Sequence, residues 1–315
     1  MWTARVMWAA VVVGASLGLD VEGEPLYNDT LAHTSCFGSS SDPVSFFSNP
    51  FYPSENYDVG FCDFTVYHSD DICQLRLDFL DFELSQPDAE GGCVSDVFKV
   101  DGLHSRAPTI CGSNTGQHMY VEVQPEAWQV ILLVETMNNL PRKWKIQVTQ
   151  IPCDSTDRAP NGCLQYYTSI TGTVSSFNFK QSPPIPSTGT RQLQRMDYGI
   201  CVGLETKHCA LEWTRNSYNG HFGFTVSGNV LLIDPVLIGT SSVSQTGHLC
   251  LNDYVIIPGG VDDMGVQADR YCGLGFPNKV YTTAAPFVLH VKTDDNEYED
   301  SGKRGFSLDY RQTLC

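Results

Sequence analysis

Cys73-Gln-Leu-Arg-Leu-Asp-Phe79 decides the fold, because its apolar and polar side chains alternate along the chain. Alternation of this kind places Leu75 and Leu77 on one face of an extended strand and their polar neighbours on the other. The same period recurs in Trp144-Lys-Ile-Gln-Val148 and in Phe287-Val-Leu-His-Val291. Helical periodicity is not sustained beyond the first residues. We therefore expect an all-β protein made of antiparallel sandwiches.

Working outward from this stretch, the chain repeats itself. Cys209-Ala-Leu-Glu-Trp-Thr214 has the same cysteine-led alternation, and Cys93-Val-Ser-Asp-Val-Phe98 corresponds to Cys250-Leu-Asn-Asp-Tyr-Val255. Six cysteines lie on each side of a polar segment, residues 154–162, that ends in Pro-Asn-Gly and is typical of a linker or turn. The order of the matches indicates two copies of one unit.

The cysteine count indicates an oxidising compartment. Twelve cysteines, an even number, predict a disulfide framework. A zinc site needs close pairs such as Cys-x-x-Cys, and the tightest spacing here is Cys201 to Cys209, so zinc is disfavoured.

The first residues resemble a secretory signal, with Arg5 ahead of the apolar run Val6–Leu17 and small residues that allow cleavage after Gly18. This run is too short to span a bilayer, and no later run reaches about 20 apolar residues. We expect export and no membrane insertion.

These observations divide the chain into five segments. The expected segments are a signal peptide at 1–18, an N-terminal arm at 19–35, a first domain at 36–153, a linker at 154–162 and a second domain at 163–315. The arm contains the sequon Asn28-Asp-Thr30, which predicts an N-linked glycan at Asn28 in an exported protein.

Charge and motifs exclude several functions. The formal net charge is −17 with only 19 basic residues, which argues against nucleic acid, and the basic cluster Arg142-Lys-Trp-Lys145 is short. Catalysis has little support, because the Gly-x-Ser-x-Gly match at 14–18 falls inside the signal and no His-Glu-x-x-His pair occurs. His118 is expected to form a local hydrogen bond. With the cysteines assigned to bridges, we expect no enzyme activity.

Several motifs resemble the CUB domain family. Asn49-Pro-Phe-Tyr-Pro53, the stretch from Leu77 to Leu84 and Cys93-Val-Ser-Asp96 carry this resemblance, which is closer in the first domain than in the second. Asn114-Thr-Gly-Gln-His-Met-Tyr120 and Gly162-Cys-Leu-Gln-Tyr166 are further similar to a group of secreted arthropod CUB-domain proteins. The resemblance implies two tandem jelly-roll β-sandwiches and an extracellular recognition role.

The resemblance also implies a disulfide pattern. CUB domains pair the opening cysteine with the next and the middle two with each other, which the repeat extends to the second domain, and the two remaining cysteines of each domain would fasten an inner strand to the final strand. The implied pairs are Cys36–Cys62, Cys93–Cys111, Cys73–Cys153, Cys163–Cys201, Cys250–Cys272 and Cys209–Cys315. A rival scheme joins neighbours such as Cys201 and Cys209 as a hairpin clasp.

Many CUB domains carry a calcium site whose acidic residues anchor a lysine of a partner protein. The matching positions in the first domain are Glu83, Asp96, Glu135 and Asn138, with Glu135 in place of the usual aspartate. Three carboxylates, an amide and waters could supply the six to eight oxygens that calcium prefers.

In the second domain Asp253 and Asp294 or Asp295 fill two of these positions, and no acidic residue matches Glu83. We expect Ca²⁺ at the first domain rather than the second.

Three functions remain open from the sequence. The first is recognition of an extracellular protein, calcium-dependent through the acidic patch of the first domain. The second is a glycan-binding, lectin-like module, for which Tyr52, Tyr166 and Tyr167 are candidate aromatic contacts. The third is a structural matrix component without a single partner.

Overall fold

The structure is a computed structural model that describes residues 33–34, 36–104, 107–124, 126–179, 190–216, 223–296, 300 and 302–315. The predicted signal peptide, almost all of the N-terminal arm and the Asn28 sequon lie outside the described residues. The chain divides into the units Met1–Leu31 and Ala32–Cys315, and the description below concerns the second.

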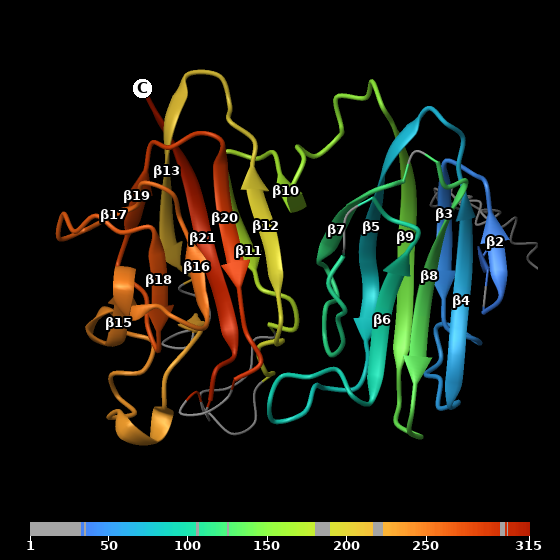
Figure 1. Ribbon diagram of the computed structural model, residues 1–315, viewed down its shortest axis with the longest axis horizontal. Helices are drawn as coiled ribbons and strands as arrows, with labels where there is room; N and C mark the ends of the chain where they lie inside the picture. Colours follow the sequence, from blue (N-terminus) through green and yellow to red (C-terminus); the bar gives the residue numbers. More distant parts are fainter. Residues whose placement is uncertain are drawn as a thin grey trace, which may run out of the picture. The chain divides into compact units, whose positions relative to one another are not determined.

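Strands β1 to β9 form the first sandwich (Figure 1). Their bounds are β1 His33–Thr34, β2 Gly38–Ser40, β3 Val44–Ser48, β4 Gly60–Tyr67, β5 Ile72–Glu83, β6 Asp96–Asp101, β7 His118–Glu122, β8 Gln129–Thr136 and β9 Lys143–Pro152. One sheet has the order β1-β3-β9-β5-β7 and the other the order β2-β4-β8-β6. All pairings are antiparallel except β1 with β3 and β2 with β4.

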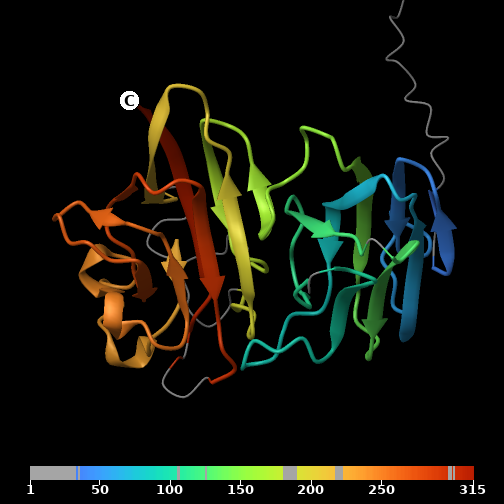
Figure 2. The same cartoon turned by 45° about the horizontal axis from the view of Figure 1, so that its top comes forward.

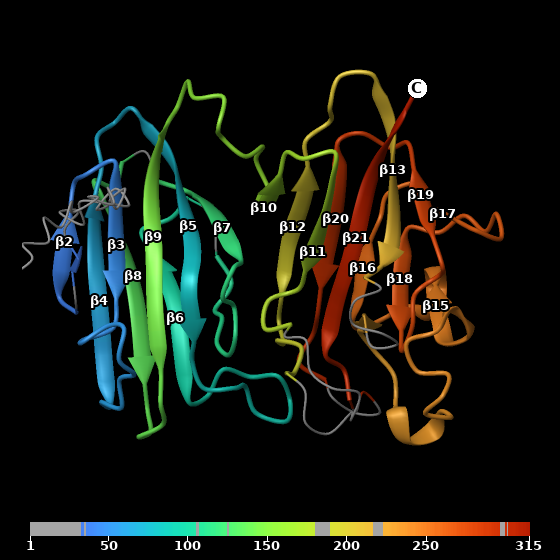
Figure 3. The same ribbon diagram turned by 180° about the vertical axis from the view of Figure 1, so that it is seen from behind.

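Strands β10 to β21 form the second sandwich, which Figure 3 shows from behind. Their bounds are β10 Cys163–Tyr167, β11 Thr171–Ser175, β12 Asp197–Val202, β13 His208–Arg215, β14 Phe224–Thr225, β15 Ser244–Thr246, β16 Tyr254–Ile256, β17 Val261–Asp262, β18 Arg270–Gly273, β19 Val280–Thr282, β20 Phe287–Lys292 and β21 Gly305–Leu314. The sheets have the orders β10-β12-β20-β16-β18-β15 and β11-β21-β13-β19-β17. The described loops of this sandwich contain the short 3₁₀ turns η2 Val230–Leu232, η3 Ser241–Val243 and η4 Gly247–Leu249.

The two sandwiches share one strand order. β2, β4, β8 and β6 pair in the same sequence as β10, β12, β20 and β16, with the first pair parallel in both. In the other sheet β3, β9, β5 and β7 correspond to β11, β21, β13 and β19. The second copy adds β14, β15, β17 and β18. The all-β prediction and the internal duplication are therefore confirmed.

Alternation along the strands creates each core. Every second residue of β8 and of most of β9 is buried, so that each strand presents one apolar face to the facing sheet. Phe47 stacks on Phe64 with 5.7 Å between ring centroids, and Phe47 also packs 5.9 Å from Trp144. Burying a side chain of this size stabilises the fold by roughly 2–3 kcal/mol.

Six disulfides fasten the strands. They join Cys36 to Cys62, Cys73 to Cys153, Cys93 to Cys111, Cys163 to Cys201, Cys209 to Cys315 and Cys250 to Cys272. These are the six pairs set out above, and the hairpin clasp does not form because Cys201 and Cys209 are bonded elsewhere. Closing loops of 80 and 106 residues stabilises each copy by very roughly 4–5 kcal/mol in the chain-entropy view.

The second sandwich contacts the first at β7 and at the loop before Asn114. The backbone N–H of Tyr166 donates to Nε2 of His118 at 3.0 Å, and β10 lies beside β7 (Figure 2). Asn178 accepts from the backbone N–H of Ser113 at 2.8 Å, and its own N–H donates to Asn114 at 2.7 Å. Gly112 faces the Asn178 side chain so closely that a Cβ would overlap it. Among the described residues, no helix is long and apolar enough to cross a bilayer.

Candidate recognition site at the loop end of the first sandwich

Five chain segments meet at one end of the first sandwich, which we call the loop end. The end of β3, the start of β4, the end of β8 and the start of β9 meet there through the pairings Ser48–Lys145 and Gly60–Thr136. Asp96, at the start of β6, pairs with Thr136 and so joins the same end. Asp96, Glu135 and Asn138 therefore come from the loop end, and Glu83, the last residue of β5, also lies there because it pairs with Lys143 at the start of β9.

Asp96 binds Arg142 and not a set of carboxylates. Both side chains are completely buried, and Arg142 donates from Nε to Oδ2 at 2.8 Å and from Nη2 to Oδ1 at 2.9 Å. The backbone N–H of Ser85 donates a third hydrogen bond to Oδ2 at 2.8 Å. A bidentate guanidinium pair of this kind satisfies the carboxylate geometrically and neutralises its charge.

The remaining donors of Arg142 tie the loops together. Nη1 donates to the carbonyl of Leu140 at 2.9 Å and to that of Asp58 at 3.4 Å, and Nη2 donates to Oδ1 of Asn138 at 2.8 Å. The carbonyl of Asn138 also accepts from Nη2. One buried cation thus orders the β8–β9 loop, the segment before β4 and the start of β6, which is the ordering role that a bound metal ion can take.

Each of the predicted calcium ligands has a partner within the chain, and the calcium site itself stays a prediction. Glu83 accepts from the Ser113 hydroxyl at 2.5 Å, whereas Glu135 pairs with Lys99 at 3.1 Å on the solvent side of β8. Asn138 and Asp96 both accept from Arg142. Within the described part of the chain, no three His, Cys, Asp or Glu side chains are placed to hold a metal ion. Arg142 thus occupies oxygens of Asp96 and Asn138, whereas Glu83 accepts from a hydroxyl and Glu135 pairs with a partly exposed lysine.

The position of Arg142 in the sequence was a signal for the buried ion pair, but its basic neighbours made it look like part of a surface cluster. Arg142 stands directly before the strand that carries buried Trp144, where a long side chain can turn back under the loops. The interpretation of residues 142–145 as a minor basic cluster was wrong for Arg142, since its charge is internal. An arginine directly before a strand, in a domain that also contains a Cys-x-x-Asp motif, is the pattern that could have indicated this buried ion pair.

The second sandwich contains its own version of the pair. Asp253 precedes β16 as Asp96 begins β6, and its Oδ2 accepts from Nζ of Lys303, with both side chains fully buried. Gln192 donates to the same oxygen at 3.2 Å, and the backbone N–H of Asp294 donates to Oδ1 at 2.8 Å. Burial raises the pKa of Asp253 above its usual range, and nearby Lys303 opposes this shift.

The acidic loop of the second sandwich also has internal partners. Asp294 accepts from the backbone N–H of Asn296 at 2.9 Å, and Asp295 forms an exposed ion pair with Arg195. Arg195 holds the pKa of the Asp295 carboxyl below its usual range by a hydrogen bond. These aspartates are thus not gathered with Asp253 as ligands of a metal ion.

An apolar pocket opens at the loop end of the first sandwich. It has a volume of about 400 Å³ and is lined by Phe37, Val59 and Phe61 above the floor formed by Trp144 and the Cys36–Cys62 bridge. Phe37 and Phe61 are 68% and 63% exposed and meet edge to face at 5.5 Å. Large exposed side chains also occur in the adjoining segments, namely Phe51, Tyr57, Met137 and Leu140.

Of the residues singled out by sequence, Tyr166, Tyr167 and His118 lie away from the loop end, whereas Tyr52 lies at it. Tyr166 and Tyr167 are in β10, where Tyr167 packs 4.9 Å from the ring of His118, and Tyr52 contacts Lys145. His118 accepts a hydrogen bond from Tyr166, as a locally bonded histidine would. Burial, with help from nearby Arg76, lowers the pKa of His118 to about 4. The neutral imidazole is therefore the form that the junction stabilises.

Comparison with known proteins supports a family assignment. Residues 160–313, which make up most of the second sandwich, match the family described as the animal CUB domain. The match falls on the domain where the sequence resemblance was the weaker of the two. No curated protein matches the chain at a significant level.

Several solved structures are similar to this chain at low identity. The CUB1-EGF-CUB2 domains of rat MASP-1 are 15% identical, with 88% of this chain and 100% of that chain covered and a TM-score of 0.30. A MASP-1 CUB2 domain bound to Ca²⁺ is 15% identical over 36% of this chain and 98% of its own, with a TM-score of 0.31. The extracellular region of zebrafish Gpr126/Adgrg6 is 11% identical over 89% and 37%, with a TM-score of 0.33.

At these TM-scores the structural likenesses carry no argument about function. The family match rests on residues 160–313, and the strand order and disulfide pattern of that segment recur in the first sandwich. CUB domains are typically protein-interaction modules of extracellular proteins. With two β-sandwiches of one strand order and the family match on the second, the chain is a CUB-domain protein.

Proposed function

We propose that this chain is a secreted recognition module that binds another extracellular protein through the loop end of its first sandwich, without calcium. The observation that carries the proposal is the pairing of the Asp96–Arg142 cluster with the exposed Phe37–Phe61 surface at the same end. The buried cation fixes the loops, and the exposed aromatic rings offer contact area that a soluble monomer rarely leaves in water.

The loop end differs chemically from a calcium site whose acidic residues bind a lysine of a partner protein. Asp96 has no charge to offer outward, because both of its oxygens accept from Arg142. Asp58 lines the same pocket, and Asp63 lies two residues from Phe61 on the outward face of β4, in a chain of net charge −17. A partner with an apolar or aromatic anchor side chain flanked by basic residues would complement both features.

Rigidity supports a preformed surface. The Thr136 hydroxyl donates to the carbonyl of Asp58 at 2.9 Å and accepts from the backbone N–H of Gly60 at 3.1 Å. These bonds hold the segment that carries Val59 and Phe61 against the end of β8. A surface that is ordered before binding loses less conformational entropy when the partner docks.

The test is a binding screen against a panel of purified extracellular proteins, performed with and without EDTA. A partner of the loop end should bind equally in both conditions and should bind roughly 30-fold less tightly to Phe61→Ala, the loss expected of an aromatic hot spot. The matched control is Met264→Ala, because Met264 is a large, highly exposed apolar residue of the second sandwich.

Two results would overturn the proposal. One is binding that EDTA abolishes, which would restore a metal-dependent mechanism. The other is binding that Phe37→Ala and Phe61→Ala leave unchanged, which would move the interface away from the loop end.

A further inference from the structure

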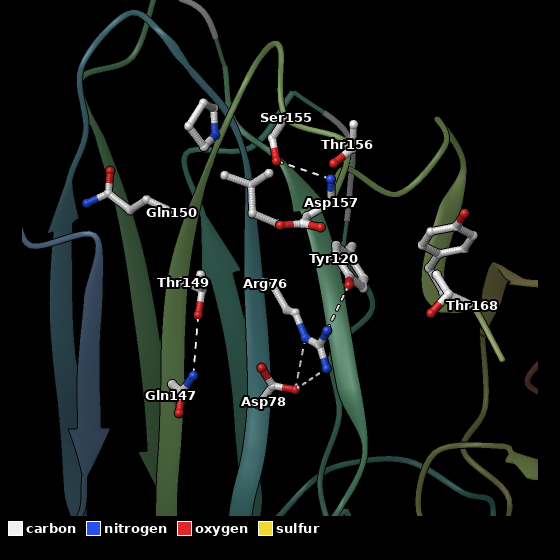
Figure 4. Close-up of a pocket in the computed structure, with 13 residues that line it drawn as sticks. Arg76, Asp78, Tyr120, Gln147, Thr149, Gln150, Ser155, Thr156, Asp157 and Thr168 are labelled. Atoms are coloured by element: carbon white, nitrogen blue, oxygen red, sulfur yellow. Dashed lines mark hydrogen bonds and ion pairs between the residues drawn. The ribbon is translucent and has the colours of Figure 1, made fainter. Parts of the chain in front are cut away.

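A second site, separate from the loop end, lies where the two sandwiches meet. A groove of about 470 Å³ runs between the outer face of β5, β7 and β9 on one side and β10 on the other, with residues 155–157 closing it. We call it the junction groove (Figure 4). Its volume lies within the roughly 300–1,000 Å³ typical of small-molecule sites.

The junction groove is lined mostly by neutral polar side chains. Eight of its thirteen side chains carry a neutral hydroxyl or amide, three are charged and only two, Ile151 and Pro152, are apolar. This composition offers many hydrogen bonds and little apolar surface. It does not suit an apolar anchor of a protein partner, which would need a pocket lined by hydrophobic side chains.

The charged residues of the groove largely satisfy one another. Arg76 donates from Nε and Nη2 to Oδ1 of Asp78 at 3.0 and 2.8 Å, and from Nη1 to the Tyr120 hydroxyl at 3.0 Å, as Figure 4 shows. The second oxygen of Asp78, Oδ2, has no hydrogen-bond partner among the described residues. Oδ2 of Asp78 can therefore accept a hydrogen bond from a ligand. Because Arg76 and Asp78 already pair with each other, neither strongly favours a charged ligand.

The walls are held in place before any ligand arrives. Gln74 accepts from the backbone N–H of Ala159 at 2.9 Å and donates to its carbonyl at 3.1 Å, which fixes the chain leading into β10. The Tyr166 N–H bond to His118 fixes β10 itself. Gln147 and Thr149 of β9 contact each other at 3.4 Å in the groove (Figure 4).

We infer that the junction groove binds a neutral saccharide unit. Sugar hydroxyls donate and accept at closely spaced positions, which carboxylates, amides and hydroxyls on neighbouring strands can match in pairs. The partly exposed ring of Tyr166, which lines the groove, adds aromatic surface on which the C–H face of a pyranose can pack. The junction groove shares no residue with the loop end, so this inference can be tested independently of the proposed function.

The probes are methyl glycosides of glucose, galactose, mannose and N-acetylglucosamine, titrated into the full chain while backbone amide NMR shifts are followed. At least one should move amides of β5, β7 and β9 saturably, with a Kd of about 1 mM or tighter. Thr149→Ala and Asp157→Asn should each weaken this binding about tenfold. Thr65→Ala, on the outer face of β4 and away from the groove, is the matched control and should leave it unchanged.

Glycopeptides that carry the same terminal sugar separate the two sources of the ligand. Binding at least as tight as that of the glycoside supports recognition of a glycoprotein, and binding of the glycoside alone supports recognition of a free saccharide. The inference is overturned if no probe moves the groove amides, if Thr65→Ala weakens binding as much as Thr149→Ala, or if lysine methyl ester binds there in preference to the sugars.

Discussion

The outer face of β5, β7 and β9 and its counterpart in the second sandwich occupy equivalent places in the repeat but have different surroundings. Tyr120 pairs with Arg76 across β7 and β5, as Tyr281 pairs with Glu212 across β19 and β13. Tyr120 is buried beside β10, whereas Tyr281 is 39% exposed. One strand pattern therefore makes a covered junction in the first copy and an open surface in the second.

This difference shows that the repeat specifies strand order and not surface chemistry. The buried acid of each copy leads to the same conclusion. Asp96 is paired by Arg142 through two oxygens, but Asp253 is paired by Lys303, and the residue equivalent to Arg142 by strand position, Arg304, instead has its guanidinium 5.9 Å from the ring of Phe179. In each copy, the buried aspartate is neutralised by a basic side chain from the segment just before the last strand.

The largest expected effect contrasts these two cations. Arg142→Met should lower the free energy of unfolding by about 3–5 kcal/mol, because it leaves a buried carboxylate without its cation. Lys303→Met should cost less, since Asp253 has a raised pKa and can take up a proton, and it keeps bonds from Gln192 and Asp294. Denaturant unfolding at neutral pH measures both.

Two further variants sharpen this contrast. Lys99→Met removes an exposed ion pair and should change stability by under about 1 kcal/mol. The double variant Asp96→Leu with Arg142→Met should recover much of the lost stability, because it removes both buried charges. Equal losses for Arg142→Met and Lys303→Met would break the distinction between the two copies.

The next effect concerns the junction and depends on pH. The folded protein lowers the pKa of His118 to about 4 from an ordinary value of 6.5. The unfolded chain therefore binds more protons between these values, so stability is fully present above pH 6.5 and is lost as the pH falls towards 4. The loss should be about 3 kcal/mol in total.

Thermal unfolding between pH 4 and pH 7 measures this loss, and His118→Gln should flatten the His118-dependent part of the profile. The counterpart of His118 by strand register is the exposed Lys279, which pairs with Glu212 and offers no such switch. A profile that is equally steep in the wild type and in His118→Gln would contradict the assignment.

The smallest of the three main effects tests how the second sandwich is held against the first. Asn178 adopts a positive φ of 60° and bonds to Ser113, Asn114 and Gln86. Asn178→Ala should lower the free energy of unfolding by about 1–2 kcal/mol. The substitution leaves buried hydrogen-bond donors without an acceptor, and alanine adopts a positive φ less readily than asparagine. Solution scattering should also report a broader range of interdomain distances.

Asn278→Ala is the control for this prediction, because Asn278 is an exposed residue of the second sandwich whose partners, Asp263 and Arg215, belong to the same sandwich. It should change neither stability nor scattering. Unchanged scattering for Asn178→Ala would indicate that other contacts suffice to hold the junction.

Much of the fold was accessible from the sequence. Alternating residues such as those of Cys73–Phe79 can bury only one face when extended, and this physical constraint makes them strands in both copies. The order of the cysteines revealed the duplication, and the CUB resemblance supplied the pairing that the structure also has. The domain limits, the signal peptide and the glycan at Asn28 stay predictions.

The site was decided by tertiary structure. Sequence identified Asp96 as the acid of a calcium motif but could not show that the side chain of Arg142, 46 residues away, reaches it. The carboxylate and the guanidinium meet only after β6, β8 and β9 have paired, and burial then favours a fixed neutralising partner at that position. The junction groove likewise exists only because β10 packs beside β7, so local sequence determined the strands, and their packing determined which charges are internal and which surfaces remain open.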